Sequence, residues 1–199
     1  MKHFLTAFLL AFSAAAAAQD LPALYSVTGV AADDVLNIRA APSASAAMRG
    51  SYAPGEAGIE VTARDETGRW GRVNLGESAG WVSMRYLQIT EPGPDVQLAR
   101  RLHCSGTEPF WSLEIEQGRR AVFRTPDGAQ QLHPGTGRLV PARGRPDRFA
   151  IGLGGGAAAV IRRAECNDGM SDQAYGLGID LLMTDAGLTL YSGCCSLQP

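Results

Sequence analysis

Apolar residues in this chain recur at every second position, a spacing that predicts strands rather than helices. In the first half, Leu36 and Ile38 alternate with polar neighbours, and the segments 59–63, 71–75 and 80–84 repeat the pattern. Loops that contain Pro or Gly separate these segments, at residues 41–43, 53–55 and 66–68. Short strands with turns at regular spacing are typical of a small closed barrel.

The second half continues the same alternation after a break. Residues 91–95 read Glu-Pro-Gly-Pro-Asp, which cannot continue a central strand, so we place a linker at 90–99. Beyond it, alternating segments predict antiparallel strands with one buried face. These segments are 111–115, 149–153, 179–183 and, last, Leu188 with Leu190. The predicted fold class is all-β, with an N-terminal small barrel followed by a C-terminal antiparallel β domain.

The first 18 residues have the pattern of an export signal. Lys2 and His3 precede an apolar run over 4–12, and alanines occupy 14–18. The apolar run is shorter than the roughly 20 residues that a membrane-spanning helix needs. We therefore expect cleavage after Ala18 and a periplasmic or secreted mature protein without a transmembrane segment.

Four cysteines lie in the second half: Cys104, Cys166, Cys194 and Cys195. In an exported chain they predict two disulfides. A bridge between the neighbours Cys194 and Cys195 would be strained. If both lie on one strand, their side chains point to opposite faces, so each takes a different partner from Cys104 and Cys166. The sequence leaves open which takes which. A zinc site is the alternative, but no CxxC pair or histidine cluster supplies its ligands.

Charge and composition argue against several functional classes. Lys2 is the only lysine, so the chain after residue 18 carries 17 arginines against 20 acidic residues, a net charge of −3. Because the arginines are scattered among acids, no basic face for nucleic acid is expected. Residues 152–157 fit a loose GxGxxA spacing, but the segment that follows is too short for a crossover helix, so no dinucleotide cofactor is expected.

A nucleophilic catalytic site is not expected either. Only His103 and His133 remain after cleavage, and cysteines held in disulfides cannot act as nucleophiles. We therefore expect a protein that is not an enzyme, with no catalytic residues, no metal and no cofactor.

A set of motifs in the first half identifies a family resemblance. The segments are 36–43 (LNIRAAPS), 54–55 (PG), 70–73 (WGRV), 80–82 (GWV) and 86–87 (YL). In order and spacing they resemble the bacterial SH3 family (SH3b, of the SH3_3 type) over residues 25–89. The resemblance implies a small barrel in an exported protein that associates with peptidoglycan or with cell-wall peptides.

The tryptophans of these motifs are the candidate ligand-binding residues. Trp70 and Trp81 fall on the opposite phase from the buried valines of their strands, so both are expected on an outer face, where aromatic rings can line a groove. Alternatively, either ring packs against a loop or against the second domain. The expected ligand-binding residues are Trp70, Trp81, Tyr86, Asn37 and Arg39.

The second half carries another set of motifs, at 103–111 (HCSGTEPFW), 166–172 (CNDGMSD) and 193–195 (GCC). It resembles a domain of uncharacterised exported bacterial proteins with the patterns CxGxEPFW, CxDGMSD and GCC, over residues 100–196. In shape and cysteine use it is also similar to small periplasmic β-barrels that inhibit lysozyme, although shape alone does not transfer function.

The same motifs contain a possible second site. Asp168, Ser171 and Asp172 share a short loop beside a cysteine, and the other cysteine motif supplies Glu108 and Trp111. Converging carboxylates can contact a ligand, bind a cation or act as acid and base. Asp-Gly and Ser-Asp are also ordinary turn residues, whose side-chain oxygens accept backbone N–H groups. The structural interpretation is the simpler of the two.

Together these patterns predict an exported, non-enzymatic binding protein whose SH3b domain contacts a cell-wall peptide or peptidoglycan. The alternative is a periplasmic inhibitor, or a protein that binds another periplasmic protein, acting through the C-terminal domain. The sequence does not determine the ligand, the oligomeric state or the role of the second domain.

Overall fold

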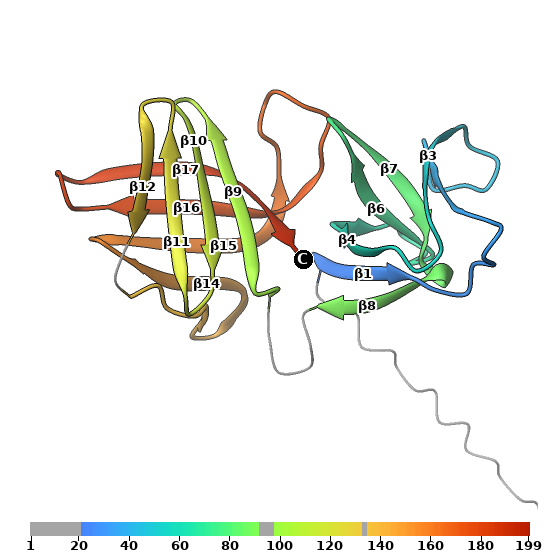
Figure 1. Cartoon of the computed structure of the whole chain (residues 1–199), viewed down its shortest axis with the longest axis horizontal. Coiled ribbons are helices and arrows are strands. Elements are labelled where there is room, and N and C mark those ends of the chain that lie inside the picture. Colours follow the sequence, from blue (N-terminus) through green and yellow to red (C-terminus); the bar gives the residue numbers. More distant parts are fainter. Residues whose placement is uncertain (1–20, 92–97, 133–134) are drawn as a thin grey trace, which may run out of the picture.

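A computed structural model of the chain describes residues 21–91, 98–132 and 135–199. Within these ranges the regular secondary structure is β throughout, apart from one 3-10 turn at Met84–Tyr86. Figure 1 shows two units side by side, each built of strands. The all-β class is therefore confirmed. The expected signal segment, most of the expected linker and His133 lie outside the described residues.

The first unit consists of two antiparallel sheets. One has the strand order β4-β1-β8 and the other β3-β2-β7-β6-β5. The chain passes from one sheet to the other at Thr62, between β4 and β5. The strand bounds are β1 (Ala23–Val27), β2 (Leu36–Arg39), β3 (Met48–Tyr52), β4 (Ala57–Val61), β5 (Ala63–Arg64), β6 (Trp70–Leu75), β7 (Ser78–Ser83) and β8 (Leu87–Glu91).

The two sheets share one hydrophobic core, and its residues follow the predicted alternation. Ile38, Val73 and Val82 are fully buried, whereas their strand neighbours are partly exposed. Gly80 also faces inward, and it has no side chain because β7 passes close to β2. A Cβ atom at Gly80 would lie 2.5 Å from the Cγ2 atom of Ile38. The inward phase predicted for these strands is confirmed.

The second unit is a single nine-stranded antiparallel sheet with the order β12-β11-β10-β9-β17-β16-β15-β14-β13. Figure 1 shows β9 to β12 crossing in front of β14 to β17, with one hydrophobic core between the two halves of the sheet. The C-terminal strand β17 pairs with both β9 and β16 and so joins these halves. The bounds are β9 (Arg101–Thr107), β10 (Phe110–Glu116), β11 (Arg120–Thr125), β12 (Gly128–Leu132), β13 (Val140–Ala142), β14 (Arg145–Gly154), β15 (Ala157–Cys166), β16 (Tyr175–Met183) and β17 (Thr189–Gln198).

Two disulfides cross-link this sheet, and they join Cys104 to Cys195 and Cys166 to Cys194. The adjacent cysteines lie on β17, so the prediction that each takes a different partner is confirmed. Strand pairing decides the connectivity, because Cys195 lies directly opposite Cys104 on β9. Cys104 and Cys195 are fully buried in the core, and Cys194 faces the other way, toward the end of β15.

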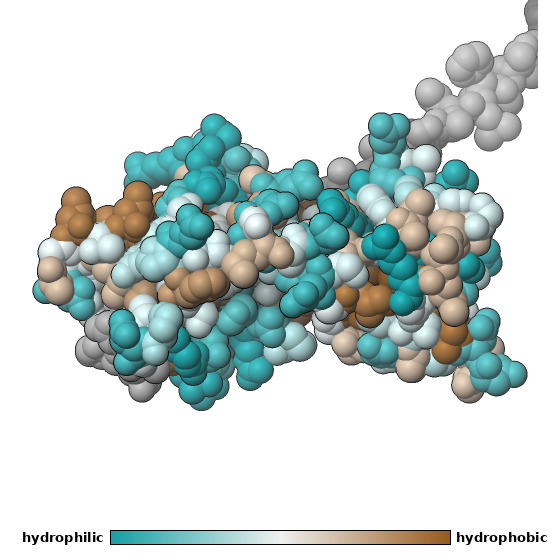
Figure 2. All heavy atoms as spheres, turned by 90° about the horizontal axis from the view of Figure 1, so that it is seen from above, coloured by the Kyte–Doolittle hydropathy of each residue, from teal (hydrophilic) through white to brown (hydrophobic). Residues whose placement is uncertain are grey.

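The expectation that Leu188 and Leu190 belong to a buried face is wrong. Leu188 precedes β17 and is 79% exposed, and Leu190 is 66% exposed. The inward phase of β17 is set by Cys195 and Leu197, so Leu190, at an even position, points outward. Figure 2 shows hydrophobic side chains gathered at the end of the second unit that is remote from the first, where the β16–β17 hairpin ends.

We predict that the Cys104→Ala/Cys195→Ala double variant loses more stability than the Cys166→Ala/Cys194→Ala double variant. The two bridges close loops with sequence separations of 91 and 28 residues. On the chain-entropy model these loops correspond to about 4 to 5 kcal/mol and about 3 to 4 kcal/mol. Urea denaturation of both variants measures the difference. An equal or larger loss in the second variant would contradict the prediction.

Candidate functional site

A cavity of about 530 Å³ opens on the outer surface of the first unit. Its walls come from the loop that follows β1, from β2, from the start of β6 and from the 3-10 turn before β8. Four of the five expected ligand-binding residues line it: Asn37, Arg39, Trp70 and Tyr86. The structure therefore brings together residues that lie up to 49 positions apart in the sequence.

The alternation of the strands positions these side chains. Asn37 and Arg39 lie between and after the buried residues of β2, so they point away from the core. Trp70 is followed by inward-facing Gly71, and it therefore lies on the same outer face of the five-stranded sheet. The predicted outward phase of Trp70 and Trp81 agrees with their partial exposure.

The cavity offers aromatic surface and hydrogen-bond donors. Trp70 and Tyr86 are only partly buried, so their rings remain accessible. One guanidinium nitrogen of Arg39 donates to the carbonyl oxygen of Ala46 at 3.1 Å, which fixes the side chain while other N–H groups stay available. The guanidinium of Arg85 lies over the Tyr86 ring, 5.5 Å from its centroid. This combination suits a ligand with a flat or apolar face and several acceptor atoms.

Trp81 does not line this cavity. It lies where the first unit meets the second, and it borders two further cavities of about 540 and 290 Å³. Both cavities are lined by Arg72, Trp81 and Glu165, so they meet at these residues. The structure thus divides the five expected residues between two places, four in the first cavity and one in the cleft between the units.

A loop of the second unit forms one wall of that cleft and is hydrogen-bonded to the β6–β7 hairpin. The Asn74 side chain donates to the Ala174 carbonyl oxygen at 3.0 Å and accepts from the Ala174 N–H at 2.8 Å. The Asp172 N–H donates to the Glu77 carbonyl oxygen at 2.9 Å. Across the cleft, Arg72 and Glu165 form a salt bridge of 3.1 Å. The side-chain amide of Asn74 therefore makes the pair of hydrogen bonds with Ala174 that a backbone peptide group of a neighbouring strand would make.

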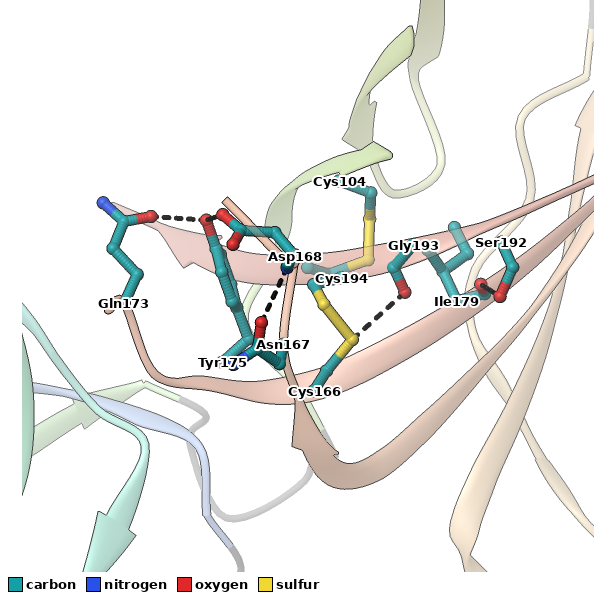
Figure 3. The surroundings of a disulfide bond; sticks show 12 residues. Cys104, Cys166, Asn167, Asp168, Gln173, Tyr175, Ile179, Ser192, Gly193 and Cys194 are labelled. Atoms are coloured by element: carbon teal, nitrogen blue, oxygen red, sulfur yellow. Dashed lines mark hydrogen bonds between the residues drawn. A yellow bond between two sulfur atoms is a disulfide. The ribbon is translucent and has the colours of Figure 1, made fainter. Parts of the chain in front are cut away.

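Asp168 organises the same loop from within. Its carboxylate accepts hydrogen bonds from the N–H groups of Met170 and Ser171 at 3.0 and 2.9 Å, and from the Ser171 hydroxyl at 2.8 Å. The Tyr175 hydroxyl donates to it at 3.3 Å, and Figure 3 shows this tyrosine beside Asp168, next to the Cys166–Cys194 bridge. Burial raises the pKa of Asp168, but these hydrogen bonds outweigh it and lower the pKa. Asp168 and Ser171 thus serve as turn residues, while Asp172 remains exposed and lines the cleft.

Glu108 and Trp111, the other candidates in the second unit, do not form a site with Asp168. Trp111 is 5% exposed and packs in the core against Phe123 and Tyr191, with ring centroids 6.0 and 5.8 Å away. A Cβ atom at Gly106 would collide with its indole. Glu108 is exposed. The two cysteine motifs are nevertheless in contact, because the Thr107 side-chain hydroxyl donates to the backbone carbonyl oxygen of Asp168 at 3.1 Å.

Glu60 is a residue of the boundary between the units that sequence reasoning missed. It lies on β4 between the buried Ile59 and Val61 and points away from the core of its own unit. There its carboxylate accepts the Leu197 N–H at 2.9 Å. Burial raises the pKa of Glu60 to about 8, although the hydrogen bond from Leu197 lowers it. No local sequence signal marks this position, because the covering strand lies 137 residues away.

No family model, curated protein or solved structure matches the chain. Among residues 21–91, 98–132 and 135–199, no group of three or more His, Cys, Asp or Glu side chains is placed to hold a metal ion. In the same ranges, no helix is long and apolar enough to cross a membrane. The candidate site therefore rests on its own geometry.

We predict that Glu60→Gln flattens the pH dependence of stability. Because the pKa is about 8 in the folded protein and 4.5 ordinarily, folding favours the protonated form. The resulting stabilisation is fully present below about pH 4.5 and is lost as the pH rises through about 8. From about pH 5 to about pH 8, the free energy of unfolding of the wild type should fall by roughly 1 kcal/mol per pH unit more than that of the variant.

Chemical denaturation at a series of pH values measures this slope. Glu66→Gln, at an exposed position of the same unit, is the matched control and should keep the wild-type slope. Parallel slopes for the wild type and Glu60→Gln would contradict the assignment of the titration to Glu60.

Proposed function

We propose that this protein is a non-enzymatic binding protein that acts outside the cytoplasm and holds a cell-wall peptide or peptidoglycan fragment in the cavity around Trp70 and Tyr86. The observation that carries the proposal is the convergence of Asn37, Arg39, Trp70 and Tyr86 on one cavity of about 530 Å³. These residues belong to the motifs that resemble the SH3b family, and the resemblance implies a wall-associated ligand.

The chemistry of the cavity supports this class of ligand. Peptidoglycan fragments combine sugar rings, peptide amides and free carboxylates. The faces of Trp70 and Tyr86 can pack against the rings and the apolar parts of such a ligand. The amide of Asn37 can pair with peptide groups, and the guanidinium of Arg39 can bind a carboxylate. The volume of the cavity falls within the usual range of roughly 300 to 1,000 Å³ for small-ligand sites.

The cysteines support a location outside the cytoplasm. All four are paired in the two disulfides, and such bonds persist in oxidising compartments. The signal-like pattern of residues 1–18 fits the same compartment. The candidate ligand-binding residues of the first cavity are aromatic, amide and guanidinium side chains, which suit binding.

We predict that Trp70→Ala weakens binding to purified cell-wall sacculi about tenfold or more, because truncating a well-packed aromatic anchor costs on the order of 2 kcal/mol. A co-sedimentation assay at increasing sacculus concentration gives the apparent affinity. Trp70→Phe should retain most of the binding, since it keeps an aromatic face.

Met48→Ala is the matched control, because Met48 is 63% exposed on the same sheet but does not line the cavity. Equal recovery of the wild type and Trp70→Ala on sacculi would refute the proposed site. Loss of binding in Met48→Ala as well would show that the loss in Trp70→Ala is not specific to the cavity, and this outcome would also contradict the proposed site.

A further inference from the structure

The cleft between the two units contains a second built pocket, separate from the cavity around Trp70. Its cavities of about 540 and 290 Å³ meet at Arg72, Trp81 and Glu165. The first unit contributes side chains of β3, β6 and β7, and the second unit contributes the end of β15 and the loop that follows it. Neither unit alone forms this pocket.

The wall supplied by the second unit is held in place from three sides. The Cys166–Cys194 bridge fixes the start of the loop to β17. Inside the loop, the Asp168 carboxylate accepts four hydrogen bonds. At its end, Ala174 is paired with Asn74, and the Gln173 side chain donates to the Gly76 carbonyl oxygen of the other unit. Because this wall is already ordered, ligand binding does not carry the entropy cost of ordering it.

Two arginines of the first unit, Arg49 and Arg72, and two carboxylates of the second, Glu165 and Asp172, line the larger cavity. Arg72 and Glu165 neutralise each other at 3.1 Å. Arg49, by contrast, donates to the Ala79 carbonyl oxygen at 2.6 Å and forms no salt bridge with any described carboxylate. Asp172, from the other unit, lines the same cavity and is exposed, and its N–H donates to the Glu77 carbonyl oxygen of the first unit. One cation and one anion therefore remain available in the larger of the two cavities.

We infer that this pocket binds a small peptide, or an amino-acid-bearing group, that carries both a free carboxylate and a free ammonium. The carboxylate pairs with the guanidinium of Arg49, which presents several N–H donors to it. The ammonium pairs with the carboxylate of Asp172, and the aliphatic part of the ligand packs against the partly exposed indole of Trp81.

A ligand with one charge fits this pocket less well. A group with only a carboxylate leaves Asp172 unpaired, and a group with only an ammonium leaves Arg49 unpaired. The inference does not rest on the proposed function, since it concerns different residues and a different pocket.

Isothermal titration of the protein with three forms of the dipeptide alanyl-alanine tests the inference. The forms are the free dipeptide, the N-acetylated dipeptide and the C-amidated dipeptide, which carry both charges, the carboxylate alone and the ammonium alone. The wild type should bind the free dipeptide about tenfold more tightly than either blocked form.

Two variants assign each charge to its partner. In Arg49→Gln, the free and C-amidated dipeptides should bind equally, because the carboxylate has lost its partner. In Asp172→Asn, the free and N-acetylated dipeptides should bind equally, and the backbone hydrogen bond of residue 172 is retained. Arg69→Gln, at an exposed position that lines none of these three cavities, is the matched control and should leave all three affinities unchanged, and Arg39→Gln reports whether the dipeptide enters the cavity around Trp70 instead.

Equal binding of the three forms by the wild type, or no binding of the free dipeptide at about millimolar concentration, would overturn the inference. So would a loss in Arg39→Gln equal to that in Arg49→Gln, because the dipeptide would then occupy the other cavity. Thermal unfolding of each variant confirms that it is folded. Since the sacculus assay reports on Trp70, failure of one proposal is distinguishable from failure of the other.

Discussion

The hydrogen bonds between Asn74 and Ala174 are a central contact between the two units. The side-chain amide of Asn74 donates to the carbonyl oxygen of Ala174 and accepts from its N–H group, as a strand residue would. Ala174 lies 100 positions later in the chain. Around it, the Asp172 N–H and the Arg72–Glu165 salt bridge join the same two segments. Because Leu24 of β1 also enters the core of the second unit, the units are packed together through both apolar and polar contacts.

The five-stranded sheet is the common base of both candidate pockets. Its inner face is apolar and shares a core with the three-stranded sheet, so every second side chain is directed outward. On the outer face, Trp70 of β6 contributes to the first cavity, and Trp81 of the neighbouring strand β7 borders the cleft. The alternation of side chains along the strands thus places both tryptophan rings on the outer face. The second unit lies against only one of them, Trp81. The proposed dipeptide pocket therefore gives the second unit a direct part in ligand recognition.

The motifs of the second unit act mainly on structure. Gly106 leaves room for the indole of Trp111, and Asp168 accepts the donors of its own loop. Sequence reasoning could recognise Asp168 as a turn residue from the Asp-Gly pair that begins there. It could not recognise that the residue four positions later, Asp172, borders a pocket formed with another unit, because the residues of the other wall lie 91 to 132 positions earlier in the chain.

By itself, the sequence determined the all-β class, the inward phase of segments such as Leu36–Ile38, the outward phase of Trp70, and the separate pairing of Cys194 and Cys195. These features follow from the two-residue period of a strand, which is a local property of the backbone. The tertiary structure alone decided the pairing of the cysteines and the exposure of Leu190. It also decided the place of Trp81 and the contact of Glu60 with Leu197. These features depend on strand order and on the packing of one unit against the other, which bring together residues as many as 137 positions apart.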